Sequence, residues 1–235
     1  MMSPKYKRVL LKLSGEALAG ANKFGLNDET LARIAGEIKQ IADLGVEVGI
    51  VVGGGNFWRG RTGGSMDRTT ADYVGMLATT MNAIALRSAI ENVGVQAEVQ
   101  SAIEMTGIAS PFTVRSAEAL LSSGSVVLFA AGTGHPYFST DTTAALRAAE
   151  IRAEIILFAK KVDAVYSDDP EKNPNAVRYT HLTHTDVLDQ NLGVMDQTAA
   201  ALCRDNGIAI QVFALDEPGN ILKAVNGEPI GTIIV

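Results

Sequence analysis

The stretch Val46 to Gly60, VEVGIVVGGGNFWRG, decides the fold prediction. It begins as an apolar run rich in β-branched residues, which is typical of a strand buried on both faces of a parallel sheet. It then enters three consecutive glycines, Gly53 to Gly55, with Arg59 four residues further on. Glycines cost backbone entropy, so a fold keeps such a run where a turn or a ligand needs bare backbone. Bare N–H groups beside a guanidinium predict a phosphate site, and a flexible strand-to-helix connection is the alternative.

Apolar runs alternate with helical patterns along the rest of the chain. The predicted strands cover 7–13, 46–52, 95–102, 125–131, 155–159, 208–214 and 232–235. The predicted helices cover 28–44, 67–92, 114–123, 142–151, 184–190, 196–206 and 218–226. This alternation predicts an α/β fold, a three-layer αβα sandwich with a mostly parallel central sheet. Such sheets bind ligands beyond the carboxyl ends of their strands.

Bulk properties limit the class of protein. No repeat or linker divides the chain, so we expect one domain over residues 1–235, with lobes at about 1–154 and about 155–235. A net charge of −6 argues against a nucleic-acid or anionic-membrane partner, which would need a broad basic field. The single cysteine, Cys203, excludes an internal disulfide and falls in an apolar helical pattern, so we expect a buried thiol. No apolar segment approaches about 18 residues, and we expect a soluble, cytoplasmic protein.

Three more predicted strand ends carry groups suited to phosphates or nucleotides. The segment Lys12 to Gly15 places a lysine at a glycine turn. Gly15 and Gly20 have the spacing of a Walker A motif, but Lys and Ser/Thr do not follow Gly20, so this is not a Walker A loop. Gly132 to Asp141 concentrates hydroxyls and aromatic rings before a helix start, and Lys160 to Asp169 mixes cations, an aromatic ring and acids. Two facing phosphate loops would suit a donor and an acceptor phosphate.

The sequence lacks the motifs of several other enzyme classes, and their absence also favours phosphoryl transfer. We find no serine nucleophile elbow, no defensible Ser-His-Asp set and no Cys/His metal cluster. The dinucleotide fingerprint fails as well, because Trp58 stands where its third glycine would be. Phosphoryl transfer needs positioning and charge neutralisation more than proton chemistry. A kinase that uses Mg²⁺ is therefore the interpretation that employs all four loops.

Five segments carry a family resemblance: KLSGEAL at 12–18, GGGNFWRG at 53–60, MDRTTADYVGMLAT at 66–79, GTGHPYFSTDTTAALRA at 132–148 and VDAVYSDDP at 162–170. Together they resemble the bacterial uridylate kinases, the UMP kinases of the amino-acid kinase superfamily. The resemblance implies the transfer of the ATP γ-phosphate to UMP in de novo pyrimidine nucleotide biosynthesis. It also implies Mg²⁺ held through the nucleotide phosphates rather than by protein side chains, a homohexamer, inhibition by UTP and activation by GTP.

The resemblance also assigns roles to matching positions. Implied in catalysis are Lys12, Arg59, Asp141 and Asp196. Implied on the ATP side are Lys12, Leu13, Ser14, Gly15, Gly55, Arg59, Lys160, Tyr166 and Asp169. The resemblance makes the first lobe the UMP-binding lobe. The residues that it places around UMP are Gly54, Asp72, Thr133, Gly134, His135, Pro136, Tyr137, Phe138, Ser139 and Thr140. The segment that matches a GTP-linked region of some members is Gly20, Ala21, Asn22, Lys23, Phe24 and Gly25.

Within these roles, Lys12 would neutralise the transferring phosphoryl group, and Asp141 and Asp196 would orient the lysine or the metal. Two positions depart from the family pattern: His135 stands where asparagine is common, and Ala164 where glycine is frequent. Lys160 lies at a variable position. Two alternatives stay open. One is a superfamily kinase acting on a carboxylate or carbamate, and the other is a catalytically silent nucleotide sensor.

Overall fold

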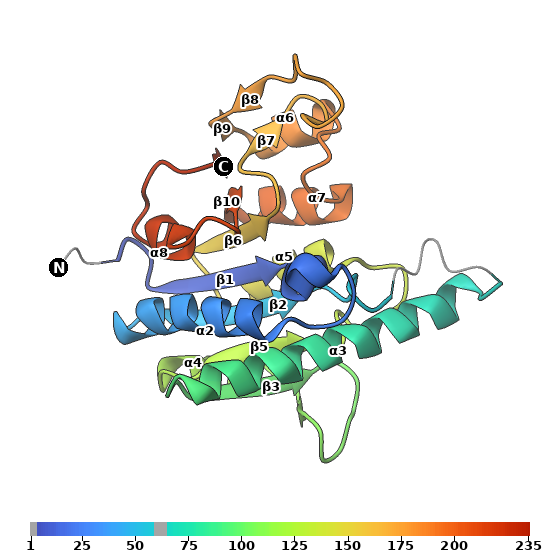
Figure 1. Cartoon of the computed structure of the whole chain (residues 1–235), viewed down its shortest axis with the longest axis vertical. Helices are drawn as coiled ribbons and strands as arrows, with labels where there is room; N and C mark the ends of the chain where they lie inside the picture. Colours follow the sequence, from blue (N-terminus) through green and yellow to red (C-terminus); the bar gives the residue numbers. More distant parts are fainter. Residues whose placement is uncertain (1–3, 59–64) are drawn as a thin grey trace.

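The computed structural model describes residues 4–58 and 65–235 of the chain. Within these residues, a nine-stranded sheet has the strand order β4-β3-β5-β2-β1-β6-β10-β11-β9 (Figure 1). The strands are β1 (Arg8–Leu13), β2 (Glu47–Val52), β3 (Ala97–Ser101), β4 (Ser110–Pro111), β5 (Val126–Ala130), β6 (Ile155–Lys160), β9 (His181–Leu182), β10 (Ala209–Ala214) and β11 (Thr232–Ile234). Neighbours in this sheet run parallel except β10 and β11. The predicted mostly parallel sheet is therefore confirmed.

Helices cover both faces of the sheet. One face carries α1 (Gly15–Ala19), α2 (Asp28–Asp43), α3 (Arg68–Asn92) and α8 (Asn220–Val225), and Figure 1 shows α2 and α3 in front of the strands. The other face carries α4 (Val114–Ser122), α5 (Thr140–Glu150), α6 (His184–Asp189) and α7 (Gln197–Asn206). This is the predicted three-layer sandwich. Of the helices in the described residues, none has both the length and the apolar character needed to cross a bilayer.

The central strand β1 shows why the sequence folds this way. Leu11 and Leu13 are fully buried in the core under α2 and α3, and Leu10 is fully buried in the core on the opposite face. A strand that must be apolar on both faces reads as a continuous hydrophobic run, as the sequence does here. Cys203, on α7, is buried in the second core as expected.

Several short elements were not predicted. Helix α1 follows the Lys12 to Gly15 turn and continues into the 3₁₀ turn Gly20–Asn22. Strands β4 and β9 have two residues each, as do β7 (Val165–Tyr166) and β8 (Arg178–Tyr179), which form an antiparallel pair of their own. Two residues are too few to show an alternating pattern, so tertiary contacts decide these strands.

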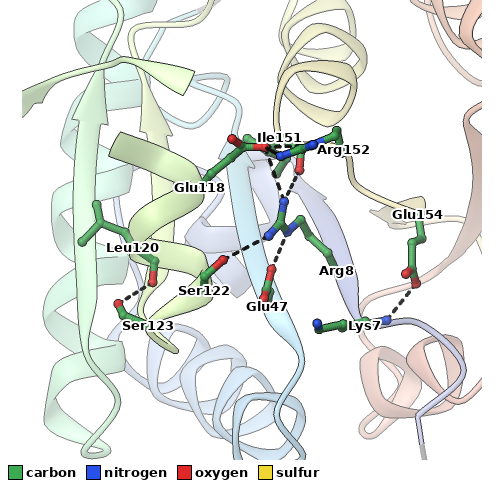
Figure 2. Close-up of polar contacts among 10 residues, drawn as sticks. All are labelled: Lys7, Arg8, Glu47, Glu118, Leu120, Ser122, Ser123, Ile151, Arg152 and Glu154. Atoms are coloured by element: carbon green, nitrogen blue, oxygen red, sulfur yellow. Dashed lines mark hydrogen bonds and ion pairs between the residues drawn. The ribbon is translucent and has the colours of Figure 1, made fainter. Parts of the chain in front are cut away.

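Arg8 binds four elements together at the edge of the sheet where β1 and β2 begin (Figure 2). Its guanidinium pairs with Glu47 of β2 and donates a 2.6 Å hydrogen bond to the carbonyl of Ile151, at the end of α5. It also lies 3.8 Å from the carboxylate of Glu118 and 3.4 Å from the hydroxyl of Ser122, both on α4. This network fixes the edge opposite to the predicted nucleotide loops.

Candidate functional site

The loops that the sequence singled out meet at one edge of the sheet. Strands β5, β2, β1 and β6 are consecutive neighbours and run parallel, so their carboxyl ends lie together (Figure 1). The segments that follow them begin at Ala131, Gly53, Ser14 and Lys161. This is the edge where open α/β sheets bind ligands. The described part of all four predicted loops is thus brought to one place.

Two of the glycines are required by close backbone contacts. A Cβ placed on Gly15 would lie 2.5 Å from the carbonyl oxygen of Gly53 and 2.8 Å from the nitrogen of Gly55. A Cβ on Gly54 would lie 2.9 Å from the carbonyl oxygen of Gly75 in α3. No side chain fits at such distances. The first turn of α1, the glycine loop and α3 therefore pack backbone to backbone.

Lys12 lies beside Asp141 in the middle of this edge. The Lys12 Nζ atom is 2.6 Å from Oδ1 of Asp141, in the first turn of α5, and 5.4 Å from the centre of the Phe158 ring. Lys12 is only 7% exposed, because strands lie on both sides of β1. An ammonium group has three donors, so one carboxylate does not exhaust it. Of the two acids expected to orient Lys12 or the metal, Asp141 is the one that pairs with Lys12.

Lys160 adds a second cation at the end of β6. Its ammonium group donates a hydrogen bond to the carbonyl of Val194 and lies 5.7 Å from the centre of the same Phe158 ring. Burial lowers the pKa of Lys160, and the charge of Lys12 lowers it further, while Asp141 acts in the opposite direction. Two lysines therefore lie near Asp141 in a chain whose net charge is −6.

Asp196 occupies a different place from Asp141. It caps α7 through the N–H of Ala199, and its carboxylate accepts hydrogen bonds from the hydroxyls of Ser139 and Thr142. Ser139 in turn caps α5 by accepting from the N–H groups of Asp141 and Thr142. Asp196 thus fixes the start of the helix that carries Asp141, and its effect on Lys12 passes through α5.

A cavity of about 130 Å³ separates α3 from the loop 131–139. Six of the residues expected around UMP line it: Gly54, Asp72, Thr133, His135, Phe138 and Thr140. Asp72 also accepts hydrogen bonds of 2.7 Å from the side chain of Arg68 and from the N–H of Tyr137. Asp72 therefore joins α3 to the loop, and the expected Ser139 faces Asp196 instead of this cavity.

A second cavity, of about 540 Å³, lies beyond the ends of β6 and β7. The three residues that the resemblance placed there, Lys160, Tyr166 and Asp169, all line it. The Tyr166 hydroxyl donates to Asp163 at 2.8 Å, and this hydrogen bond raises the pKa of Tyr166. Asp169 lies 2.8 Å from the ammonium of Lys172. Both cavities lie at the carboxyl ends of the parallel strands. Lys12 and Lys160 lie near the ends of the neighbouring central strands β1 and β6.

Leu13, Ser14 and Gly55, all expected on the ATP side, lie in or beside the turn after β1. Leu13 ends β1 and is fully buried, and the Ser14 side chain caps α1 by accepting from the N–H of Ala17. A Cβ on Gly55 would lie 3.2 Å from the carboxylate of Glu16. Arg59, expected in catalysis and on the ATP side, lies outside the described residues.

The segment Gly20 to Gly25 contacts the glycine loop directly. The N–H of Gly25 donates to the carbonyl of Asn56 at 3.1 Å, and the rings of Phe24 and Phe57 meet edge to face at 5.7 Å. A region expected to bind an effector therefore touches a loop expected to bind phosphate.

Sequence reasoning missed Asn82, which is fully buried in α3 and contacts both Gly53 and Asn56. A signal was present. Asn82 interrupts the apolar stripe of Ala78, Leu86 and Ile90, which recur every four residues on one helix face. A buried amide in such a stripe needs hydrogen-bond partners, and here they belong to the glycine loop.

The model of the amino acid kinase family matches residues 7–214. The chain belongs to the amino acid kinase family. Three solved structures of this family's uridylate kinases are similar to it over nearly their whole length. The UMP kinase from Bacillus anthracis is 41% identical, with a TM-score of 0.94, over 97% of this chain and 96% of that one.

The UMP kinase from Ureaplasma parvum is 38% identical, with a TM-score of 0.92, over 98% of this chain and 99% of that one. The uridylate kinase from Archaeoglobus fulgidus is 32% identical, with a TM-score of 0.76, over 97% and 99%. The resemblance predicted from the five sequence motifs is therefore confirmed, in sequence and in fold.

Proposed function

We propose that the chain is a UMP kinase, which transfers the γ-phosphate of ATP to UMP and yields ADP and UDP. An oxygen of the UMP phosphate attacks the γ-phosphorus, and the bond to the oxygen that bridges the β- and γ-phosphates breaks. The observation that carries the proposal is the Lys12–Asp141 pair at the edge shared by two cavities. Phosphoryl transfer needs such a fixed cation, because negative charge spreads over the moving group.

On the donor side, Lys12 neutralises the transferring phosphoryl group, and Asp141 orients the ammonium group of Lys12. Backbone at Leu13, Ser14, Gly15 and Gly55 approaches the ATP phosphates, while Lys160, Tyr166 and Asp169 surround the rest of the nucleotide. The cavity beside Tyr166 supports this, since an aromatic ring offers a stacking surface to adenine. Arg59 is assigned to the same phosphates.

On the acceptor side, Asp72 takes the sugar hydroxyls of UMP, and Gly54 and the loop 133–140 surround its phosphate and base. The cavity between α3 and this loop supports the assignment. We assign UMP to the first lobe, about 1–154, which also supplies the turns that approach the ATP phosphates, and the rest of ATP to the second lobe, about 155–235. His135 lines the cavity, so imidazole replaces the amide that is common at this position in the family.

Magnesium accompanies ATP in this proposal. No cluster of three or more His, Cys, Asp or Glu side chains suited to a metal occurs in the described residues. We assign Mg²⁺ to the nucleotide phosphates and water, which is the ion's usual arrangement in kinases. When bound, the ion would neutralise part of the charge on the ATP phosphates.

We also propose that the chain forms a cytoplasmic homohexamer and acts in de novo pyrimidine nucleotide biosynthesis. UTP inhibits this assembly's activity, and GTP activates it through the segment 20–25.

An apolar stripe on α3 supports self-association. Tyr73, Leu77 and Met81 follow one another at four-residue spacing and are 46%, 54% and 47% exposed. Sedimentation of the wild type and of Leu77→Glu, with and without UTP and GTP, tests the assembly. A monomeric wild type would contradict it.

A coupled assay of ADP release tests the activity itself, with UMP, CMP, dTMP and acidic amino acids offered as acceptors. We expect rapid turnover with UMP and slow turnover with the others. Equal turnover of CMP, or turnover of an amino acid alone, would contradict the proposal. No turnover together with tight UTP binding would favour the nucleotide sensor.

A further inference from the structure

Three consecutive glycines do not hold a fixed conformation by themselves, so other groups must hold Gly53 to Gly55. Asn82 supplies one such support from α3. Its amide nitrogen donates to the carbonyl of Gly53 at 2.7 Å and to the side-chain oxygen of Asn56 at 2.7 Å. The Asn82 side chain is completely buried, so water does not replace these hydrogen bonds.

Asn56 supplies the other half of the support. Its amide nitrogen donates to the side-chain oxygen of Asn82 at 3.0 Å and to the carbonyl of Gly25 at 2.7 Å. The N–H of Gly25 returns a hydrogen bond to the carbonyl of Asn56 at 3.1 Å. Asn56 is 1% exposed, so the two asparagines form a reciprocal amide pair inside the protein. This pair connects α3, the glycine loop and the segment that ends at Gly25.

The same pair reaches the turn after β1. A Cβ placed on Gly15 would lie 2.5 Å from the side-chain oxygen of Asn56, as close as it would lie to the carbonyl of Gly53. Asn56 therefore packs directly against the first turn of α1, which begins three residues after Lys12. Any displacement of the amide pair moves both backbone segments that flank Lys12.

We propose that the Asn56–Asn82 pair is a positioning unit that holds both phosphate-binding turns in register with Lys12 and couples them to the segment Gly20–Gly25. The inference rests on the proposed function, because it assigns phosphates to these turns. It does not place either asparagine in contact with substrate. Their effect is exerted through backbone position, to which transfer reactions are sensitive: a misplacement of about 1 Å costs about 10²-fold in rate.

The first test replaces Asn82 with leucine, which keeps the volume and removes the hydrogen bonds. We expect kcat to fall about 10²-fold, with the KM for UMP changing much less, because Asp72 and the loop 131–139 are not touched. Gln211→Leu is the matched control. Gln211 is also a buried amide that donates to two carbonyls, those of Glu228 and Ile230, but it lies in β10.

Melting temperatures separate positioning from simple destabilisation. If Asn82→Leu and Gln211→Leu lose similar thermal stability but only Asn82→Leu loses kcat, the proposal holds. A near-normal kcat in folded Asn82→Leu, or an equal loss in Gln211→Leu, would overturn it. Should Asn82→Leu fail to fold, Asn82→Ser leaves room for water to reach both partners and provides the same comparison.

A second readout does not depend on which substrate the enzyme uses. Trp58 is the only tryptophan of the chain, lies two residues after Asn56, and donates its indole N–H to the carbonyl of Ala71 at 2.9 Å. Its fluorescence therefore reports the position of the glycine loop. We expect acrylamide to quench Trp58 more strongly in Asn82→Leu than in the wild type or Gln211→Leu. Unchanged quenching would overturn the proposal even if the wild type phosphorylated something other than UMP.

Coupling within the pair is tested by a double-mutant cycle. Because Asn56→Ala and Asn82→Ala each break the same unit, the double variant should lose little more kcat than either single variant. Losses that multiply would show two independent structural residues and would contradict the proposal.

Discussion

The ammonium group of Lys12 lies 2.6 Å from the carboxylate of Asp141 and joins β1 to the first turn of α5. Both side chains are largely buried, at 9% and 18% exposure. The lysine is therefore oriented before any substrate arrives, with donors remaining for a second anion. A cation fixed in advance stabilises charge that develops in a transition state without reorganising during the reaction.

We expect Lys12→Ala to lower kcat by about 10²- to 10³-fold, the usual cost of removing a preorganised electrostatic donor. The affinity for UMP should change little, since the cation meets mainly the charge that moves between the nucleotides. Turnover assays and calorimetric titration with UMP measure the two effects. Lys39→Ala is the control, because Lys39 forms an exposed pair with Asp43 on α2. A near-normal kcat in Lys12→Ala would contradict the assignment of Lys12 to the transferring phosphoryl group.

We expect Asp72→Ala to raise the KM for UMP by about tenfold or more, the worth of a hydrogen bond to a charged group, and to leave the KM for ATP nearly unchanged. The variant should also loosen the loop 131–139, because the N–H of Tyr137 loses its acceptor. Faster limited proteolysis within that loop measures this second effect. Asp205→Ala, at an exposed position on α7, is the control. A selective loss of ATP affinity would contradict the placement of Asp72.

Much of the fold and the location of the site could be predicted from local sequence. Val126 to Ala130 forms an unbroken apolar run and is a buried strand, and Asn27 and Ser139 cap helices as their residue types favour. Parallel strands then bring their following loops together, wherever those loops lie in the chain. For this reason the sequence could predict that the glycines, hydroxyls and lysines of distant segments meet at one edge of the sheet.

Residue pairings could not be predicted in the same way. Asp141 and Asp196 were equivalent candidates in the sequence, but only the packing of α5 against α7 decides that Asp141 meets Lys12 while Asp196 meets Ser139. The Asn56–Asn82 pair likewise depends on how α3 crosses the glycine loop. Such contacts join distant segments, and local propensity carries no information about them.

We expect His184 to make stability fall as the pH is lowered. Burial lowers its pKa below the ordinary value of 6.5, so the unfolded chain binds a proton at a pH where the folded chain does not. The free energy of unfolding then decreases as the pH falls below about 6.5, until the folded-state pKa is passed. Urea unfolding across this range measures the slope, which His184→Gln should reduce. His181→Gln, at an exposed position, should leave it unchanged, and equal slopes in all three proteins would contradict the prediction.

Arg8 makes its contacts at the edge of the sheet opposite to the site, and Figure 2 shows these contacts. We expect Arg8→Met to lower the free energy of unfolding by up to about 3 kcal/mol, because Glu47 is left as a largely buried, unpaired charge. The double variant Arg8→Met, Glu47→Leu should recover part of this loss, since both charges are gone. Urea unfolding measures both, and kcat and the KM values should change little, because the lost contacts lie at the ends of β1 and α5 that are far from Lys12 and Asp141. Arg204→Met, which breaks an exposed pair with Asp205, should cost less than about 1 kcal/mol. A loss in Arg8→Met as small as that of Arg204→Met would show that the network at this edge contributes little to stability.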